Sequence, residues 1–339
     1  MSTARHTVAA PPLPRPGQDH GPGAGPERPT AAQEHWLEYE GFRYVCRVAT
    51  SPAPVTEPLV VIGGMMQDRN SWTTHERPLR AHASVVTVEL PGFGAADPLP
   101  AEYGYDFLAA ALGHLLTELD TGPVNLLGTC YGGAVALRCA QRYPQHVARL
   151  MLGAMTGEPP ASYLEMIPEW RRLVAEDRRG ELADSLLSTF VVAPDSRIHR
   201  HAAVWRMLNH QFRTQTPDDL AKACDHNARM ERHAWRRPGV PAVPTLVYTG
   251  EHDHLTTPAQ GLRLARELRA PFATLRDADH MFPLEQVAAH VDLIRSFCGD
   301  HPLTGLPYLG ALEYPEGQAP SDAQGGAAAR AVTRRPAGP

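Results

Sequence analysis

The sequence lacks the features that mark several large classes of protein. Its five cysteines, among 339 residues, are odd in number and show neither a C-x-x-C pair nor a metal-ligand spacing. We therefore expect neither a disulfide scaffold nor a zinc module, but a cytoplasmic protein with reduced thiols. No apolar run approaches the roughly 20 residues of a membrane-spanning helix. The N-terminal sequence also has no continuous apolar stretch typical of a signal peptide.

A strong charge of one sign is also missing. The formal net charge is −5 at pH 7, which gives no reason to expect nucleic acid or a membrane surface as a partner. Hydrophobic residues make up 43% of the chain, enough for a large core. The length suits one large α/β domain with an insertion, or two small domains.

Both ends of the chain lack a periodic apolar pattern. Residues 1–34 and 301–339 are rich in proline, glycine and alanine, and such segments cannot bury enough apolar surface to become ordered. We predict that both are disordered tails. Between them we expect residues 35–155 and 239–300 to form the two parts of one core domain, with residues 156–238 as an insertion.

Short apolar runs alternate with helical spacing through the core. After an opening hairpin over 36–48, strands are predicted at 59–62, 85–90, 124–127, 149–153, 245–248 and 272–275. Helices are predicted at 107–119, with Asp106 placed as the cap, and at about 134–142, 261–268 and 284–297. This alternation predicts an α/β fold with a mostly parallel, doubly wound sheet. The segment 156–238 has helical patterns only, so we expect a helical cap inserted after the sixth strand, over the sheet edge where such folds bind ligands.

A G-x-C-x-G pattern occupies residues 128–132, between a predicted strand and a predicted helix. This is the context of a nucleophile elbow, in which a strained turn requires small residues two positions before and after the nucleophile. The start of the following helix favours a thiolate at Cys130. The alternative is that Cys130 is a buried structural thiol, as we expect for Cys139, Cys46 and Cys298.

Two further side chains follow predicted strands at the same edge of the sheet. Asp253 lies in the loop after the strand 245–248, and His280 lies in the loop after the strand 272–275. A nucleophile in an elbow needs a base and a group that orients the base. The chain order Cys130, Asp253, His280 matches the nucleophile, acid, histidine order of α/β-hydrolases, so we predict that these three residues are catalytic.

Three longer motifs carry a resemblance to the cap-bearing α/β-hydrolase superfamily over about residues 36–298. Glu89–Gly94 with Asp97 is similar to its D-L-P-G-F-G-x-S-D loop, with glutamate in place of the first aspartate. Gly250–Asp253 with Pro258 is similar to its G-x-x-D-x-x-x-x-P segment, and Asp279–Glu285 to its G-H-x-x-x-x-E segment. The resemblance implies an α/β-hydrolase fold in which a cysteine replaces the usual serine.

In that superfamily the first core strand runs into His-Gly-Phe-Pro, where this chain has Gly63-Gly64-Met65-Met66. The resemblance implies that the backbone N–H groups of Met65 and Tyr131 form the oxyanion hole. Because backbone groups would bind the oxyanion, glycine at 63 need not disable it. The missing histidine removes a side chain that anchors the loop and leaves room for a different substrate shape.

A metal cluster is an alternative interpretation of His252, Asp253, His254, Asp279 and His280. Their spacing fits no zinc pattern, and neighbouring residues at a strand end point to opposite sides. We therefore expect no metal and no cofactor. Asp279 also competes with Asp253 as the residue that orients His280, but it adjoins the histidine in sequence and is poorly placed to reach it.

The insertion has a positive charge excess in an acidic chain. Residues 170–237 contain 13 Arg/Lys and nine Asp/Glu, a local balance of +4. A solvated helical surface is the favoured interpretation. The alternative is that the cap meets an anionic carrier, so that the small-molecule acyl substrate arrives on coenzyme A or an acyl carrier protein.

A cysteine nucleophile bears on the reaction that we expect. A thiol with a pKa near 8.5 can be ionised before attack, and a thiolate both attacks and leaves readily, so it exchanges with thioesters. We expect an acyltransferase similar to thioesterases, in which Cys130 takes the acyl group, His280 moves the proton and Asp253 holds His280. The alternative is an ester or lactone hydrolase. A third alternative is a ligand-binding protein without activity. We consider it remote, because both the acid and the histidine of the triad are present.

Overall fold

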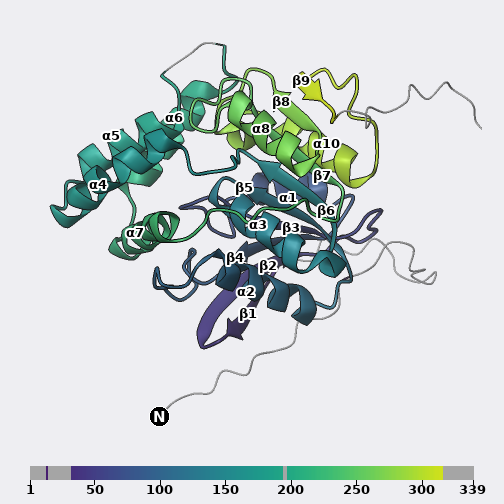
Figure 1. The fold of residues 1–339 in the computed structure, drawn as a ribbon, viewed down its shortest axis with the longest axis horizontal. Helices are drawn as coiled ribbons and strands as arrows, with labels where there is room; N and C mark the ends of the chain where they lie inside the picture. The colour runs from purple at the N-terminus through teal and green to yellow at the C-terminus, as the bar shows by residue number, and fades with distance from the viewer. Residues whose placement is uncertain (1–12, 14–31, 194–196, 316–339) are drawn as a thin grey trace, which may run out of the picture.

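A single nine-stranded sheet runs through the part of the chain that the computed structural model describes, residues 13, 32–193 and 197–315. The strand order is β1-β2-β4-β3-β5-β6-β7-β8-β9 (Figure 1). The strands are β1 (Gln33–Tyr39), β2 (Phe42–Ala49), β3 (Leu59–Ile62), β4 (Val85–Glu89), β5 (Val124–Thr129), β6 (Val147–Gly153), β7 (Thr245–Gly250), β8 (Phe272–Leu275) and β9 (Leu309–Glu313).

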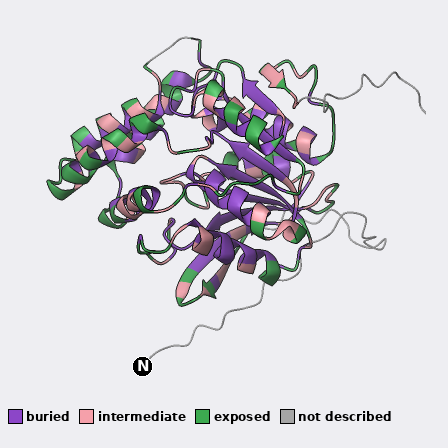
Figure 2. Cartoon of the chain, in the orientation of Figure 1, coloured by how far each residue is buried: buried purple, intermediate pink, exposed green. Residues whose placement is uncertain are grey.

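Strands β3 to β8 are parallel to one another, whereas β1, β2 and β9 pair antiparallel with their neighbours. Every residue of β3, β4, β5, β7 and β8 is buried, and Figure 2 shows this buried centre. Burial on both faces explains why these strands are continuous apolar runs in the sequence. The predicted mostly parallel, doubly wound sheet is confirmed.

Helices cover both faces of the sheet. Helices α2 (Tyr105–Glu118), α3 (Tyr131–Arg142) and α8 (Pro258–Leu268) pack on one face, and α1 (Thr73–Leu79) and α10 (Val287–Cys298) pack on the other. Alternate strand residues serve the two faces, as the pleat requires. Val60 and Ile62 join the first core, and Leu59 and Val61 join the second.

In the described part of the segment between β6 and β7 there are four helices, which confirms the helical insertion after the sixth strand. They are α4 (Ala161–Ala175), α5 (Arg179–Phe190), α6 (His201–Arg213) and α7 (Pro217–Arg232), and they extend to one side of the sheet in Figure 1. The limits of the cap at 156 and 238 remain a prediction. Arg229 of α7 is fully buried and donates to the carbonyl oxygens of Leu99 at 2.7 Å and Tyr103 at 2.6 Å, so it joins the cap to the core.

The predicted tails are wrong at their inner ends. Gln33 begins β1, and β9 lies within 301–339, paired with β8 and bonded from the Ala311 N–H to the Thr274 hydroxyl at 2.8 Å. A five-residue strand with one buried residue, Leu309, gains its order from this partner and not from its own pattern. The rest of the tails, residues 1–12, 14–31 and 316–339, lie outside the described residues.

One predicted helix cap is also wrong. Gly104 is the capping residue of α2, and Asp106 lies in the first turn, where its carboxylate accepts from Arg138 of α3 at 3.1 Å. Its position still places a negative charge near the positive end of the helix dipole. None of the helices in the described part of the chain has both the length and the apolar character needed to cross a membrane.

Candidate active site

Cys130 occupies the sharp turn between β5 and α3. Its backbone has φ +50° and ψ −119°, a strained conformation for a residue with a side chain. A Cβ atom at Gly132 would lie 2.5 Å from the Ile62 carbonyl oxygen, and one at Gly128 would lie 2.6 Å from the Gly132 carbonyl oxygen. The turn therefore requires both glycines, and Cys130 stands where an elbow places its nucleophile.

Asp253 and His280 meet at the same edge of the sheet, as the sequence predicts. Asp253 follows β7, His280 follows β8, and Asp253 Oδ2 lies 3.0 Å from His280 Nδ1. Asp253 Oδ2 also accepts from the hydroxyls of Thr249 and Thr256, both at 2.6 Å. Asp253 Oδ1 accepts from the Leu255 and Thr256 backbone N–H groups at 3.0 and 2.7 Å. These donors fix the carboxylate, which in turn orients the imidazole.

The electrostatics of this group favour a charged histidine. Burial lowers the pKa of His280, but the charge of Asp253, the hydrogen bond to it and the adjacent Cys130 sulfur together raise that pKa well above its usual value. Burial raises the pKa of Asp253, whereas His280 and the threonine hydroxyls lower it, and the net result lies below the usual value. An imidazolium next to a sulfur atom stabilises the thiolate form.

We expect Cys130 to be the thiol that iodoacetamide alkylates first, even at pH 6, because the imidazolium of His280 persists there. The other thiols are poor targets: burial raises the pKa of Cys46, Cys139 and Cys298 to about 12, and burial also raises that of half-buried Cys224. Peptide mass mapping at short times should find the label on Cys130. In His280→Ala the rate at pH 6 should fall by about tenfold or more, and equal rates in the two proteins would show that His280 does not activate Cys130.

The loop before α1 is anchored differently from the expectation. Gln67 Oε1 accepts from the Gly64 N–H at 2.7 Å, and a Cβ atom at Gly63 would lie 2.7 Å from that same oxygen. The Gln67 side chain therefore fills the space at Gly63 and holds the loop, so the expectation of a lost anchor and free room was wrong.

The Tyr131 N–H, one of the two groups expected in the oxyanion hole, is in the first turn of α3, where helices leave their N–H groups unpaired.

A cavity of about 310 Å³ opens above Cys130 and His280. Its other walls are mainly apolar and come from the cap and from the segment after β8, which includes the short helix α9 (Phe282–Glu285). They include Phe190, Met207, Leu208, Phe212, Met281, Phe282, Pro283 and Leu284, with Gly64 and Met65 beside the cysteine. This cavity, called the acyl cavity below, suits an apolar group next to the sulfur.

Asp279 does not orient His280. Its oxygens accept from the backbone N–H groups of Met281 at 2.6 Å and Val192 at 3.0 Å, and its own N–H donates to Glu285 Oε2 at 2.8 Å. Glu285 Oε1 lies 3.4 Å from His201 Nδ1 of the cap. The two carboxyl groups are fully buried, and together they connect the cap to the loop that carries His280.

The five residues weighed as a metal cluster do not gather into one group, although Asp253 and His280 are hydrogen-bonded to each other. Among the described residues, two groups of three side chains have potential ligand atoms within 4.8 Å: one is His201, Asp279 and Glu285, and the other is Glu251, His252 and Asp277. In the buried group each carboxylate oxygen already faces an N–H group or the histidine.

We expect the contribution of Glu285 to stability to fall as the pH rises from about 5 to 8. Burial, and then the charge of Asp279, raises the pKa of Glu285 to about 8. A raised pKa means that the folded protein holds this proton more tightly than the unfolded chain. The stabilisation is complete below the unfolded pKa near 4.3 and is lost by about pH 8, at roughly 1 kcal/mol per pH unit.

Urea unfolding of wild type and Glu285→Gln between pH 5 and 9 tests this linkage. The glutamine is neutral at every pH, so the difference in unfolding free energy between the two proteins should change across that window and level off above it. A difference that stays constant with pH would show that Glu285 titrates normally.

Arginines of the cap are largely engaged in ion pairs. Within the cap the pairs are Arg171–Glu231, Arg172–Glu169, Arg172–Glu176, Arg178–Glu181, Arg179–Asp177 and Arg213–Asp184. Arg232, Arg236 and Arg237 pair with the core acids Glu102, Glu267 and Asp106. These pairs offset much of the local positive charge and favour the solvated surface, while the carrier partner remains a prediction.

Comparison with known proteins gives the class of the protein. Residues 57–287 match the sequence profile of the family described as alpha/beta hydrolase fold. Because the match covers more than half of the chain, the protein belongs to the α/β-hydrolase family.

The relatives are consistent with an enzyme of this family. The chain is 30% identical over 264 residues to a pimeloyl-[acyl-carrier protein] methyl ester esterase of Neisseria meningitidis, covering 74% of this chain and 97% of the esterase. A 100-residue segment is 36% identical to the dihydrolipoyllysine-residue acetyltransferase component of the acetoin cleaving system of Pseudomonas putida. That match spans 30% of this chain and about a quarter (27%) of the relative.

A solved structure confirms the fold. The α/β-hydrolase enzyme MGS-M2, from a Medee basin deep-sea metagenome library, superposes with a TM-score of 0.69 at 18% identity, over 79% of this chain and 98% of that chain. By the family match and the esterase relative, the protein is an enzyme of the α/β-hydrolase family, with cysteine at the elbow. The roles of three supporting residues could not be predicted from the sequence, because they depend on contacts that no motif records. These residues are Thr249, Thr256 and Gln67.

Proposed function

We propose that the protein hydrolyses carboxylic esters or lactones through an acyl-cysteine intermediate. Cys130 would be the nucleophile, His280 the acid and base, and Asp253 the residue that holds His280. The backbone N–H groups of Met65 and Tyr131 would bind the oxyanion. The observation that carries the proposal is the chain of contacts from Cys130 to His280 to Asp253 at the base of the acyl cavity.

In the acylation step the Cys130 thiolate attacks the carbonyl carbon and pushes its electron pair onto the carbonyl oxygen, where the two N–H groups bind it. Collapse of the tetrahedral intermediate expels the alcohol oxygen, which takes the proton of His280. A thioester to Cys130 and a neutral imidazole remain. His280 then removes a proton from water as the water oxygen attacks the thioester, and Cys130 leaves again as a thiolate beside the imidazolium.

The esterase relative supports hydrolysis over the acyl transfer expected from the thiol. Acyl transfer remains the second candidate, and the cysteine itself favours it, because an acyl thioester passes readily to an alcohol, amine or thiol. In that case the acceptor replaces water in the second step. A coenzyme A or carrier-protein donor stays a prediction of this second candidate.

Intact mass measurement tests the nucleophile. Wild-type protein mixed with p-nitrophenyl esters and acyl thioesters of several chain lengths should gain the mass of one acyl group, and Cys130→Ala should gain none. Cys130→Ser should acylate far more slowly, because a serine hydroxyl is not ionised in advance. If the alanine variant were acylated, or if no donor acylated the wild-type protein, Cys130 would not be the nucleophile.

The products separate the two candidates. With a donor and excess glycerol or free thiol, a hydrolase releases mainly free acid, whereas a transferase releases mainly the acylated acceptor. Chromatography of the mixture gives this ratio directly. Free acid as the main product supports hydrolysis.

A further inference from the structure

The acyl cavity has no charged side chain in its walls beyond the pair at its base. Of the described residues that line it, none is aspartate, glutamate, lysine or arginine. His280 is the one lining group that can carry a positive charge, and it is already paired with Asp253 at 3.0 Å. A carboxylate at the far end of an acyl chain would therefore lose its hydration here without gaining a cation.

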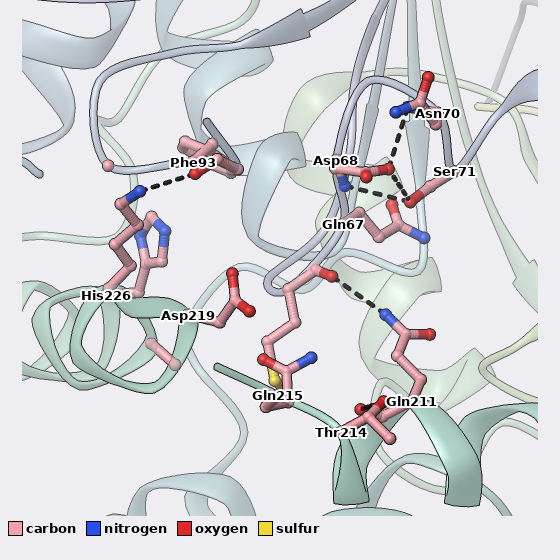
Figure 3. Close-up of a pocket in the computed structure, with 15 residues that line it drawn as sticks. Gln67, Asp68, Asn70, Ser71, Phe93, Gln211, Thr214, Gln215, Asp219 and His226 are labelled. Atoms are coloured by element: carbon pink, nitrogen blue, oxygen red, sulfur yellow. Dashed lines mark hydrogen bonds between the residues drawn. The ribbon is translucent and has the colours of Figure 1, made fainter. Parts of the chain in front are cut away.

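A polar cavity next to the acyl cavity offers no cation either. This second cavity, of about 410 Å³, lies between α6, α7 and the core loops at 66–71 and 92–94. Figure 3 shows the wall that the two cavities share, where Gln211 Nε2 donates to the Met66 carbonyl oxygen at 3.3 Å. Lys222 lines the second cavity but already donates to the Asp218 carboxylate at 2.6 Å, and burial lowers the pKa of His226 to about 3. An acyl chain that reached across this wall would still require an uncharged end.

Phe190, the last residue of α5, forms the cap wall beside the histidine. Its ring centroid lies 5.9 Å from that of His280, 6.1 Å from that of Phe212 and 5.9 Å from that of Tyr163. The Phe190 side chain is 5% exposed, so helices α4 and α6 hold the ring in a packed position from which it moves only at a cost. The carbons that follow the carbonyl of an acyl group on Cys130 run beside this ring. A branch on the first of them would meet it.

We propose that the acyl cavity selects short, uncharged acyl groups with no branch next to the carbonyl, such as butanoyl or hexanoyl, and that Phe190 determines the selection against branching. The volume of about 310 Å³ favours a short chain, since small-molecule sites span about 300–1,000 Å³. The chain lies against the apolar cap wall, and the carbonyl oxygen faces the N–H groups of Met65 and Tyr131. This proposal rests on the acyl-cysteine mechanism proposed above and adds the class of acyl group.

Three ethyl esters with a six-carbon main chain test the selection: ethyl hexanoate, ethyl 2-methylhexanoate and monoethyl adipate. In wild type we expect kcat/KM for the hexanoate to exceed that for the adipate by about 100-fold or more, and that for the branched ester by about tenfold or more. In Phe190→Ala the ratio of linear to branched ester should fall by about fivefold or more. The comparison with wild type removes the intrinsic reactivity of each ester. Phe107→Ala, the same change on α2 and outside both cavities, should keep the wild-type ratios.

A substitution at Met207 tests the role of charge without removing a core side chain, and so serves even if Phe190→Ala does not fold. Met207 lines the acyl cavity and is 45% exposed, so a lysine there stays hydrated while its ammonium group reaches the acyl end. Met207→Lys should raise kcat/KM for monoethyl adipate relative to ethyl hexanoate by about fivefold or more, and the uncharged Met207→Gln should not. No gain with lysine, or an equal gain with glutamine, would contradict the selection by charge.

Binding separates failure of this proposal from failure of the proposed function. In the Cys130→Ala background, calorimetry should show that ethyl hexanoate binds about tenfold or more tightly than monoethyl adipate. Adding Phe190→Ala should narrow the difference in affinity between ethyl hexanoate and ethyl 2-methylhexanoate. These results would support the selection even if wild type cleaved no ester. Equal kcat/KM for hexanoate and adipate in wild type, or an unchanged ratio of linear to branched ester in folded Phe190→Ala, would overturn it.

Discussion

Replacing His280 with alanine should lower kcat/KM for ester substrates by about 10⁴-fold while leaving the fold intact. The loss is large because the proposed mechanism uses one side chain in three steps: it assists attack by the sulfur, protonates the leaving alcohol and deprotonates water. Asp253 would still accept from Thr249, Leu255 and Thr256, so its buried carboxylate keeps donors and the protein should still fold.

His254→Ala is the matched control, because this histidine lies in the same loop as Asp253 but is exposed. It should keep wild-type activity. Circular dichroism and thermal unfolding of both variants separate loss of chemistry from loss of structure. Retention of more than about a tenth of the wild-type kcat/KM in His280→Ala would remove this residue from the mechanism.

The largest effect on stability is expected from Gly132→Ala. The new Cβ atom would lie 2.5 Å from the Ile62 carbonyl oxygen, which belongs to the backbone of β3. The atoms that the new Cβ would meet belong to the backbone and not to a flexible side chain. Helix α3 and strand β3 would therefore have to separate in the middle of the core. We expect a loss of more than about 4 kcal/mol in the free energy of unfolding, or no soluble protein.

Gly180→Ala provides the comparison within the same chain. Gly180 lies in the first turn of α5, and the nearest atom to its new Cβ is the flexible end of Arg213, at 3.3 Å. Alanine is the better helix residue there, so stability should rise by roughly 0.5–1 kcal/mol. Urea unfolding of the two variants measures the contrast, and similar stabilities would contradict the close approach at Gly132.

The sheet could be predicted because its central strands are buried on both faces. Such strands stand out as apolar runs, and the loops at their ends carry Cys130, Asp253 and His280. Strand β9 could not be predicted, since only one of its residues is buried and its order depends on pairing with β8. The role of Asp106 could not be predicted for a similar reason. Whether its carboxylate caps α2 or pairs with Arg138 depends on α3, a helix distant in sequence.

The predicted active-site residues Asp253 and His280 form their expected hydrogen bond, but the residues that support them could not be read from the sequence. Asp279 and Asp253 both neighbour a histidine in the chain, and only the three-dimensional arrangement shows which carboxylate reaches His280. The pairing of cap arginines likewise depends on which helices meet. The sequence therefore predicts an excess of positive charge on the cap, but the ion pairs in the folded protein determine how much of that charge is left unpaired.

The contact between Gln67 and Gly63 makes these two positions depend on each other. A side chain at 63 would occupy the volume that the Gln67 side chain now fills, so neither substitution is independent of the other. Histidine at 63, the residue that the His-Gly-Phe-Pro motif would place there, should be far more harmful alone than together with Gln67→Ala. A side chain at 63 would therefore be accepted only if position 67 changed with it, so the two positions would have to be exchanged as a pair.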